Sequence, residues 1–171
     1  MLAAVRDRRS IRKYEERPVE REVIDQLQEA MLRAPSSRNF KPWRFVFVTD
    51  RELLRSLSQS KPRWSDFLSD AALGVVICAD PAVSDCWIED CSIAATVLQL
   101  SATDLGLGSC WIQIRDRQHA DARSAEEYVR EVLGLPAGFR VVCMVSIGYP
   151  AEEKAPRERE GLHWEKVGVR G

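Results

Sequence analysis

The chain has 171 residues, of which 25 are lysine or arginine and 26 are acidic, and 45% are hydrophobic. This length suits a single domain over residues 1–171 with a core of its own. The near-neutral charge argues against a general nucleic-acid binder, which is usually basic. No apolar run is long enough to span a membrane, and the first ten residues lack the apolar region of a signal peptide. We therefore expect a cytoplasmic protein.

The cysteines and histidines indicate neither a disulfide framework nor a metal site. There are five cysteines and two histidines. The cysteine number is odd, there is no C-x-x-C pair, and no cysteine lies close in sequence to His119 or His163. We therefore expect no bound metal, interpret the cysteines as small buried residues, and interpret His119 as an exposed loop residue.

The first half of the chain predicts two helices and two strands. Residues 18–34 carry apolar side chains at helical spacing and begin with Pro18, which suits a first helical turn. A loop rich in proline, serine and asparagine follows at 35–42. The next predicted elements are a strand over 43–49, a helix over 51–59 capped by Asp50, a short helix or turn over 62–70, and a buried strand over 71–79.

The second half is dominated by a helix predicted over residues 88–105. It is apolar on most sides, so it must be central or lie in a subunit interface. A strand over 109–115 and a strand over 139–149 follow. Between them, the capping box of Ser124 and Glu127 predicts the start of a helix, and Gly134 predicts its end. Without a regular βαβ alternation or an internal repeat, the pattern predicts an α+β domain.

The segment RRSIRKY, residues 8–14, gathers positive charge near the start of the chain. Arginine side chains bind phosphate oxygens through two parallel hydrogen bonds, and a serine hydroxyl can donate another. Arg8, Arg9, Ser10 and Arg12 therefore suit one compact phosphate group. A solvated helix end remains an alternative. A nucleic-acid patch is a third reading, weakened by acidic residues on both sides of the segment.

Three further stretches carry polar or flexible residues that suit ligand binding. PSSRNFKPW, residues 35–43, offers hydrogen-bonding groups that could read a planar heterocycle, or is a plain connecting loop. GLGSCWI, residues 106–112, allows close backbone approach and supplies a flat indole, or simply ends a helix before a core strand. EEKAPRER, residues 152–159, is a second basic cluster or a solvated tail.

The order of these motifs resembles the nitroreductase family of FMN-dependent oxidoreductases. The shared motifs are R-R-S-x-R, P-S-S-x-N-x-x-P-W, G-L-G-S-C-W-I, S-I-G-Y-P-A-E-E-K and a late R-x-R. The resemblance covers about residues 6–166. It implies an α+β fold in which helices flank a central mixed or antiparallel sheet. It also implies an interlocked homodimer with two FMN sites at the interface, the helix 88–105 in the dimer core, and the tail of about 151–171 packed on the partner.

By the same resemblance, the family's cofactor contacts fall on four groups of residues in this chain. They are Arg8, Arg9, Ser10 and Arg12 at the phosphate and ribityl end; Arg157 and Arg159 completing that cradle; Pro35, Ser36, Ser37, Asn39 and Lys41 on the loop that reaches the partner's flavin; and Ser109, Cys110 and Trp111 along the ring. Two departures stand out. Lys41 replaces the family's usual glutamine, and Gln113 and Ile114 stand where many relatives carry a glycine pair.

The resemblance implies hydride transfer from NAD(P)H to FMN N5, and from there to a small electron-poor acceptor such as a nitroaromatic or a quinone. It implies no catalytic side chain, no nucleic acid and no membrane. Three alternatives stay open: an FMN store or sensor without efficient turnover, specialised flavin chemistry on the same fold, and an RNA-binding protein led by the basic motif.

Overall fold

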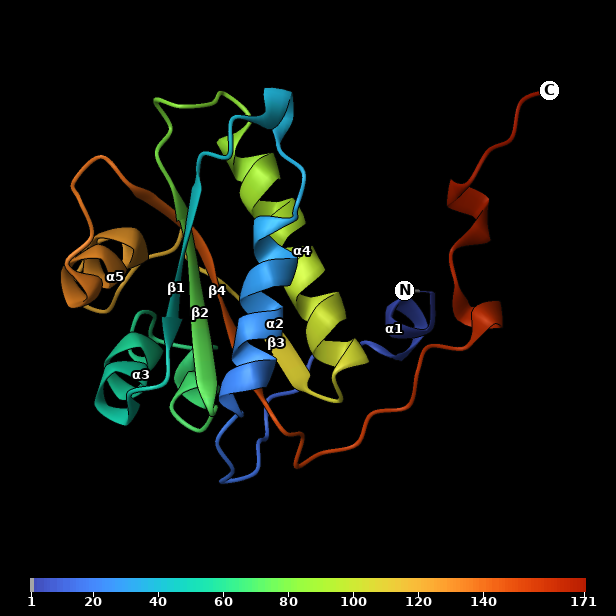
Figure 1. Cartoon of the computed structure of the whole chain (residues 1–171), viewed down its shortest axis with the longest axis horizontal. Coiled ribbons are helices and arrows are strands. Elements are labelled where there is room, and N and C mark those ends of the chain that lie inside the picture. Colours follow the sequence, from blue (N-terminus) through green and yellow to red (C-terminus); the bar gives the residue numbers. More distant parts are fainter. Residues whose placement is uncertain (1) are drawn as a thin grey trace.

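The computed structural model describes residues 2–171 and has a four-stranded sheet at its centre (Figure 1). Every neighbouring pair of strands is antiparallel, in the order β1-β2-β4-β3. The strands are β1 (Trp43–Val48), β2 (Leu73–Ala79), β3 (Gly108–Gln113) and β4 (Arg140–Gly148). All four predicted strands and the α+β class are confirmed, and the sheet is antiparallel throughout.

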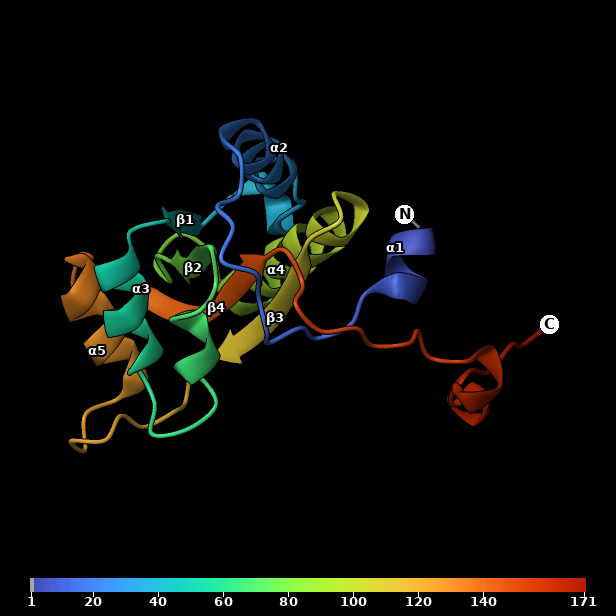
Figure 2. The ribbon, with the colours of Figure 1, turned by 90° about the horizontal axis from the view of Figure 1, so that it is seen from below.

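Helices cover both faces of the sheet, so the body has three layers (Figure 2). On one face lie α2 (Arg21–Leu32) and α4 (Trp87–Asp104); on the other lie α3 (Arg51–Ser58) and α5 (Ala125–Leu133). The alternation of side chains along the central strand β2 feeds two cores. Val75 and Ile77 pack with α2 and α4, whereas Val76 and Cys78 pack with α3 and α5.

The ends of the helices follow the local signals in the sequence. The Asp50 side chain accepts a hydrogen bond of 2.8 Å from the Leu53 N–H at the start of α3. Ser124 and Glu127 form the predicted capping box of α5, and Gly134 ends that helix with a φ of 61°. The predicted start of α2 at Pro18 is wrong. Helical turns begin at Arg21, because Glu20 stays extended, with a φ of −64° and a ψ of 147°, and serves as the N-cap.

A short helix, α1 (Leu2–Asp7), precedes the basic segment and was not predicted. Its apolar residues Leu2–Val5 are consecutive, so the sequence shows no helical spacing that would predict it. α1 packs against α4 to one side of the sheet (Figures 1 and 2). It brings the start of the chain to the helix that was expected to be central.

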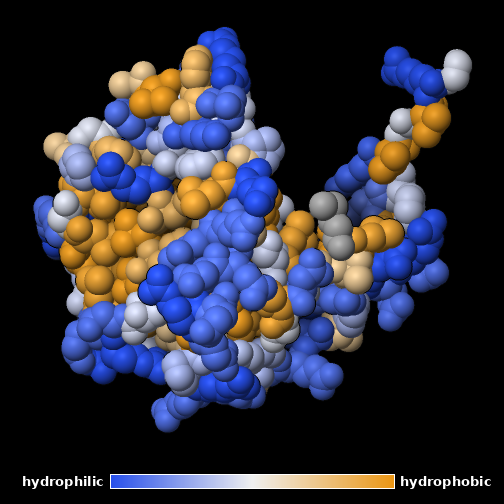
Figure 3. Space-filling view, in the orientation of Figure 1, coloured by the Kyte–Doolittle hydropathy of each residue, from blue (hydrophilic) through white to orange (hydrophobic). Residues whose placement is uncertain are grey.

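The C-terminal segment leaves the body after β4 and projects as an extended arm (Figure 1). Two short 3₁₀ turns, η3 (Arg159–Gly161) and η4 (Trp164–Lys166), are its regular elements. Apolar side chains lie exposed along it (Figure 3), namely Leu162, Trp164, Val167 and Val169. Burial of such side chains against another surface would be favourable, and the packing of this tail on a partner stays a prediction.

Over residues 2–171 no helix is both long and apolar enough to cross a membrane. Within the same range no group of three or more His, Cys, Asp or Glu side chains is arranged to hold a metal ion. The five cysteines are free thiols, and four of them are buried. His119 does not match its expected exposure, because its ring stacks on Tyr128 at a centroid distance of 4.1 Å.

Replacing Ser124 by alanine tests the cap of α5. The variant removes the side-chain acceptor of the Glu127 N–H and one half of the capping box, so the free energy of unfolding should fall by about 1 kcal/mol. Urea denaturation measures this change. Ser124→Thr retains a hydroxyl acceptor and should stay close to the wild type; equal stability of the alanine variant would contradict the assigned role.

Candidate functional site

The basic segment is fixed to the exposed edge of β3 by backbone contacts. Ser10 forms an isolated parallel bridge with Ser109, and the Ile11 N–H donates to the Ser109 carbonyl at 3.0 Å. Gly108 makes this close approach possible, because a Cβ at that position would lie 2.8 Å from the Ile11 side chain. The segment therefore has a defined position beside the strand that follows α4.

Tyr14 locks the end of this segment into the core. Its hydroxyl lies 2.7 Å from the Ile11 carbonyl and 2.7 Å from the Ser146 hydroxyl of β4. Burial raises the pKa of the Tyr14 hydroxyl above its usual value, so the group stays protonated and able to donate at neutral pH. Its ring covers Gly148, where an added Cβ would lie 2.9 Å from the ring.

A hollow of about 770 Å³ opens beside the basic segment. Its lining combines residues of α1 and the basic segment with residues of the C-terminal tail. The lining residues are Leu2, Val5, Arg6, Arg8, Arg9, Ser10, Arg12, Lys154, Arg157, Arg159, Leu162 and Trp164. We call this the cationic hollow. It contains all six residues predicted for the phosphate and ribityl end of the cofactor, although four of them lie within residues 8–12 and two within residues 157–159.

The positive charge in the cationic hollow is only partly neutralised by the chain itself. Among residues 2–171, Arg8, Arg12 and Arg157 form no ion pair with a carboxylate. Lys154 is the exception, with its Nζ 3.0 Å from a Glu152 carboxylate oxygen. Unpaired guanidinium groups held together in a hollow favour an anionic ligand.

Two cations of this region also have structural tasks. The Lys154 ammonium donates to the Ser10 carbonyl at 2.7 Å, and the Arg9 guanidinium donates to the Ala155 carbonyl. The backbone N–H of Arg12 donates to Glu152 at 2.6 Å, which together with Lys154 lowers the pKa of the Glu152 carboxyl. These contacts clamp the start of the tail onto the basic segment.

The first residues of β3 lie directly beside Ser10. The Ser109 hydroxyl is buried and has no hydrogen-bond partner among the described residues. Cys110 is 2% exposed, and burial raises the pKa of its thiol, so it is protonated at neutral pH and a weak nucleophile. Its position agrees with a packing role.

The departure at Gln113 and Ile114 has a structural explanation. The Trp111 indole N–H donates at 3.0 Å to the side-chain oxygen of Gln113, whose amide donates to the Arg115 carbonyl at 2.8 Å. Ile114 is completely buried. Gln113 therefore fixes the indole in place, and Ile114 belongs to the core.

The loop with Ser36, Ser37, Asn39 and Lys41 lies elsewhere in the same chain. Its anchor is Asp90, in the first turn of α4, a carboxylate only 2% exposed that accepts from the Ser37 N–H at 2.7 Å. The Ser36 hydroxyl accepts from the Lys41 N–H at 2.9 Å. Asn39 and Lys41 have positive φ angles of 58° and 50°, a conformation that costs energy for side chains other than glycine.

The loop and the cationic hollow lie at opposite ends of α4. Ser37 contacts the first turn of this helix, whereas Ser109 follows its C-terminal end. A helix of 18 residues is about 27 Å long. One chain therefore brings together Arg8, Arg9, Ser10, Arg12, Ser109, Cys110, Arg157 and Arg159, but not Pro35, Ser36, Ser37, Asn39 and Lys41.

Three important residues were absent from the predicted site. Lys154 belongs to the second basic cluster of the sequence and could have been included on that ground. Asp90 and Tyr14 act through buried side-chain contacts with backbone groups distant in sequence. No local sequence pattern indicates such contacts.

Comparison with known proteins assigns this arrangement to a family. The sequence profile of the Nitroreductase family matches residues 5–76 and 59–149. An archaeal relative from Archaeoglobus fulgidus, provisionally named NADH dehydrogenase/NAD(P)H nitroreductase, is 38% identical over 157 residues, covering 90% of this chain and 87% of its own. The FMN reductase [NAD(P)H] of Bacillus subtilis is 27% identical, covering 93% of this chain and 69% of its own.

A solved structure has nearly the same backbone. An FMN-dependent nitroreductase from Clostridium difficile R20291 superposes with a TM-score of 0.96 at 45% sequence identity, covering 100% of this chain and 99% of that one. The α+β fold with a sheet between helical layers is therefore that of the nitroreductases. The chain belongs to the nitroreductase family.

Replacing Tyr14 by phenylalanine tests the lock on the basic segment. The variant removes the contacts with the Ile11 carbonyl and the Ser146 hydroxyl, so the free energy of unfolding should fall by about 1–2 kcal/mol. Amides of residues 10–15 should exchange faster with solvent, as measured by hydrogen exchange.

Tyr128→Phe is the matched control, because the Tyr128 hydroxyl donates to the Ser56 carbonyl at 2.9 Å, away from the hollow. It should lower stability comparably without accelerating exchange in residues 10–15. Equal hydrogen-exchange rates of residues 10–15 in the two variants would show that the Tyr14 hydroxyl does not stabilise this segment.

Proposed function

We propose that this protein is an FMN-dependent oxidoreductase. It would take hydride from NAD(P)H and reduce a small, flat, electron-poor acceptor of the nitroaromatic or quinone type. The observation that carries the proposal is the cationic hollow, in which Arg8, Ser10 and Arg12 meet Arg157 and Arg159. The names of relatives that reduce FMN or depend on it, in the same family, support the choice of cofactor.

The residues of the hollow fit a flavin mononucleotide on chemical grounds. Its phosphate is a compact dianion, and guanidinium groups bind phosphate oxygens in pairs. The buried Ser109 hydroxyl, without a partner among the described residues, leaves a polar group for the rest of the cofactor. FMN, when bound, supplies two-electron chemistry that protein side chains lack.

The tasks of the protein side chains would then be binding and orientation. Arg8, Arg12, Arg157 and Arg159 would hold the phosphate, and Ser10 would donate a further hydrogen bond. Ser109, Cys110 and Trp111 would lie along the ring, with the indole held by Gln113. No side chain at this site is needed as acid, base or nucleophile, and the protonated Cys110 thiol is poorly suited to such a role.

The active unit would be a homodimer, in which the loop of residues 35–41 from one chain faces the cationic hollow of the other. Two features support this assembly. The loop and the hollow are separated by the length of α4, so a site that includes both would need two chains. The tail also exposes apolar residues, including Trp164 and Val167, that gain free energy when covered. Asn39 and Lys41 would then reach the flavin of the partner.

The phosphate assignment predicts the behaviour of the double variant Arg8→Ala/Arg12→Ala. Removing two unpaired guanidinium groups from the hollow should leave mostly apo protein and raise the Kd for FMN by at least about a hundredfold, since each charged hydrogen bond contributes about 1.5–3 kcal/mol. Fluorescence titration with FMN measures this change. Arg21→Ala/Arg55→Ala, which removes the same charge outside the hollow, should bind normally, and full occupancy of the first variant would refute the assignment.

The proposed function itself is tested by the absorption spectrum of the purified protein. Oxidised-flavin bands should be present and should bleach without air when NADH or NADPH is added. A quinone or nitroaromatic should then restore them repeatedly. A yellow protein that does not bleach would favour an FMN store or sensor, and a colourless protein that FMN cannot reconstitute would exclude flavin chemistry.

A further inference from the structure

A second hollow adjoins the cationic hollow on the far side of Arg12 and Lys154. It measures about 490 Å³, and its lining includes Trp64 and Phe67 as well as those two cations. The Arg12 guanidinium lies over the Phe67 ring, 5.6 Å from its centroid. A ligand in this second hollow would therefore lie next to whatever the cationic hollow holds.

Trp64 is the unusual residue of this region. The residue is 73% exposed, more than the other exposed aromatic residues Trp164 and Phe40. Its φ of 69° lies in the left-handed region, which is a genuine outlier for a bulky side chain. Strained backbone conformations cluster at functional sites. A strained residue whose indole lines two hollows is therefore a candidate for ligand binding.

The loop that carries Trp64 is anchored on both sides. Before it, Ser60 is buried, and its carbonyl lies 3.2 Å from the Nδ1 atom of His119. After it, Ser65 and Phe67 are buried, and the Ser65 hydroxyl donates to the Lys61 carbonyl at 3.4 Å. The indole therefore projects from a fixed base.

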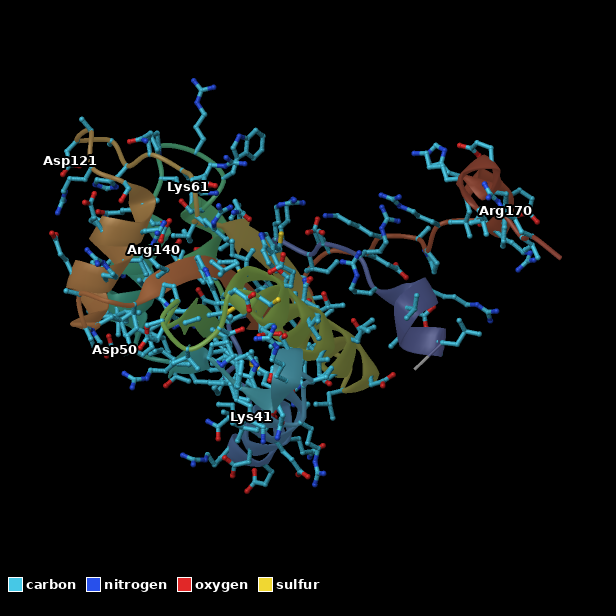
Figure 4. The ribbon with its side chains drawn as sticks, turned by 90° about the horizontal axis from the view of Figure 1, so that it is seen from above. Lys41, Asp50, Lys61, Asp121, Arg140 and Arg170 are labelled. Carbon is cyan, nitrogen blue, oxygen red and sulfur yellow. The ribbon has the colours of Figure 1, made fainter. Side chains whose placement is uncertain are left out.

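The surroundings of Trp64 carry excess positive charge. A third, smaller hollow of about 370 Å³ also borders Trp64 and is lined by Lys61, Pro62, Arg63, Trp64 and Asp66. Together the two hollows beside Trp64 contain five cations, Arg12, Lys13, Lys61, Arg63 and Lys154, against the carboxylates of Asp66, Asp70 and Glu152. Lys61 lies on the opposite side of the body from Lys41 (Figure 4), so these cations are distinct from the loop of residues 35–41.

We propose that Trp64, Lys61 and Arg63 form the recognition site for the pyridine dinucleotide that reduces the flavin, which rests on the proposed function. The indole offers an electron-rich face on which one aromatic base of the dinucleotide stacks. Lys61 and Arg63 neutralise its phosphates. A neutral nitroaromatic or quinone has no use for these two cations, so the charge favours the dinucleotide over the acceptor.

The test uses the FMN-loaded protein and the variant Trp64→Ala. The Kd for NADP⁺ and for NAD⁺ is measured by calorimetry, and the NADPH concentration that half-saturates anaerobic flavin reduction is measured by stopped flow. Loss of one stacked base should raise both quantities about tenfold, which corresponds to about 1.4 kcal/mol. Trp64→Phe keeps an aromatic face and should stay within about threefold of the wild type.

Charge is tested separately with Lys61→Ala/Arg63→Ala. This variant should bind dinucleotide more weakly and with a smaller dependence on salt, whereas Arg55→Ala on α3 should behave as the wild type. FMN occupancy and the acceptor KM at saturating NADPH should be unchanged in the Trp64 and Lys61/Arg63 variants.

Four outcomes overturn the inference. They are an unchanged dinucleotide Kd in Trp64→Ala, an effect of that variant on the acceptor KM alone, loss of FMN from it, and normal dinucleotide binding by Lys61→Ala/Arg63→Ala. The first two leave the proposed function intact, because the wild type still holds and reduces flavin. A wild-type protein without flavin would instead refute the proposed function and this inference together.

Discussion

The backbone contact between Ser10–Ile11 and Ser109 determines where the basic segment of this protein lies. It ties the basic segment to the edge of β3, and Tyr14 secures the same segment against β4. Lys154 and Glu152 then attach the beginning of the tail to it. Arginines from both ends of the chain thus converge on one hollow. Like charges held close together repel one another, so the arrangement needs a rigid frame, and the proposed phosphate would offset the repulsion.

The proposed roles divide this charged surface into two parts that share Arg12 and Lys154. The cationic hollow would serve the phosphate of a resident cofactor, and the region around Trp64 would serve a ligand that comes and goes. The second region presents the more exposed aromatic residue, since Trp64 is 73% exposed and Trp164 of the cationic hollow is 49% exposed. Weaker, exposed contacts suit a ligand that is released in every cycle.

Much of the fold could be predicted from the sequence because its signals are local. The capping box at Ser124, the cap at Asp50 and the apolar runs of β2 and β4 each depend on neighbouring residues. α1 was not predicted, because its apolar residues are consecutive and show no helical spacing. For the site, the local density of arginine predicted the basic segment. The other site residues were predicted from the resemblance to a family. The roles of Asp90 and Tyr14 could not be predicted, because their side chains contact backbone groups far away in the sequence. Asp90 contacts Ser37, 53 positions away, and Tyr14 contacts Ser146, 132 positions away.

The position of the loop 35–41 at the opposite end of α4 from the cationic hollow has a genetic consequence. In the proposed dimer each site takes its loop from one chain and its arginines from the other. A chain that lacks Arg8 and Arg12 and a chain whose loop 35–41 is defective would each form homodimers in which both sites are defective. A mixed dimer of the two would unite the intact loop and the intact arginines at one site and both defects at the other. Two such alleles expressed in one cell would therefore complement each other, and each mixed dimer would reach up to half the activity of a wild-type dimer.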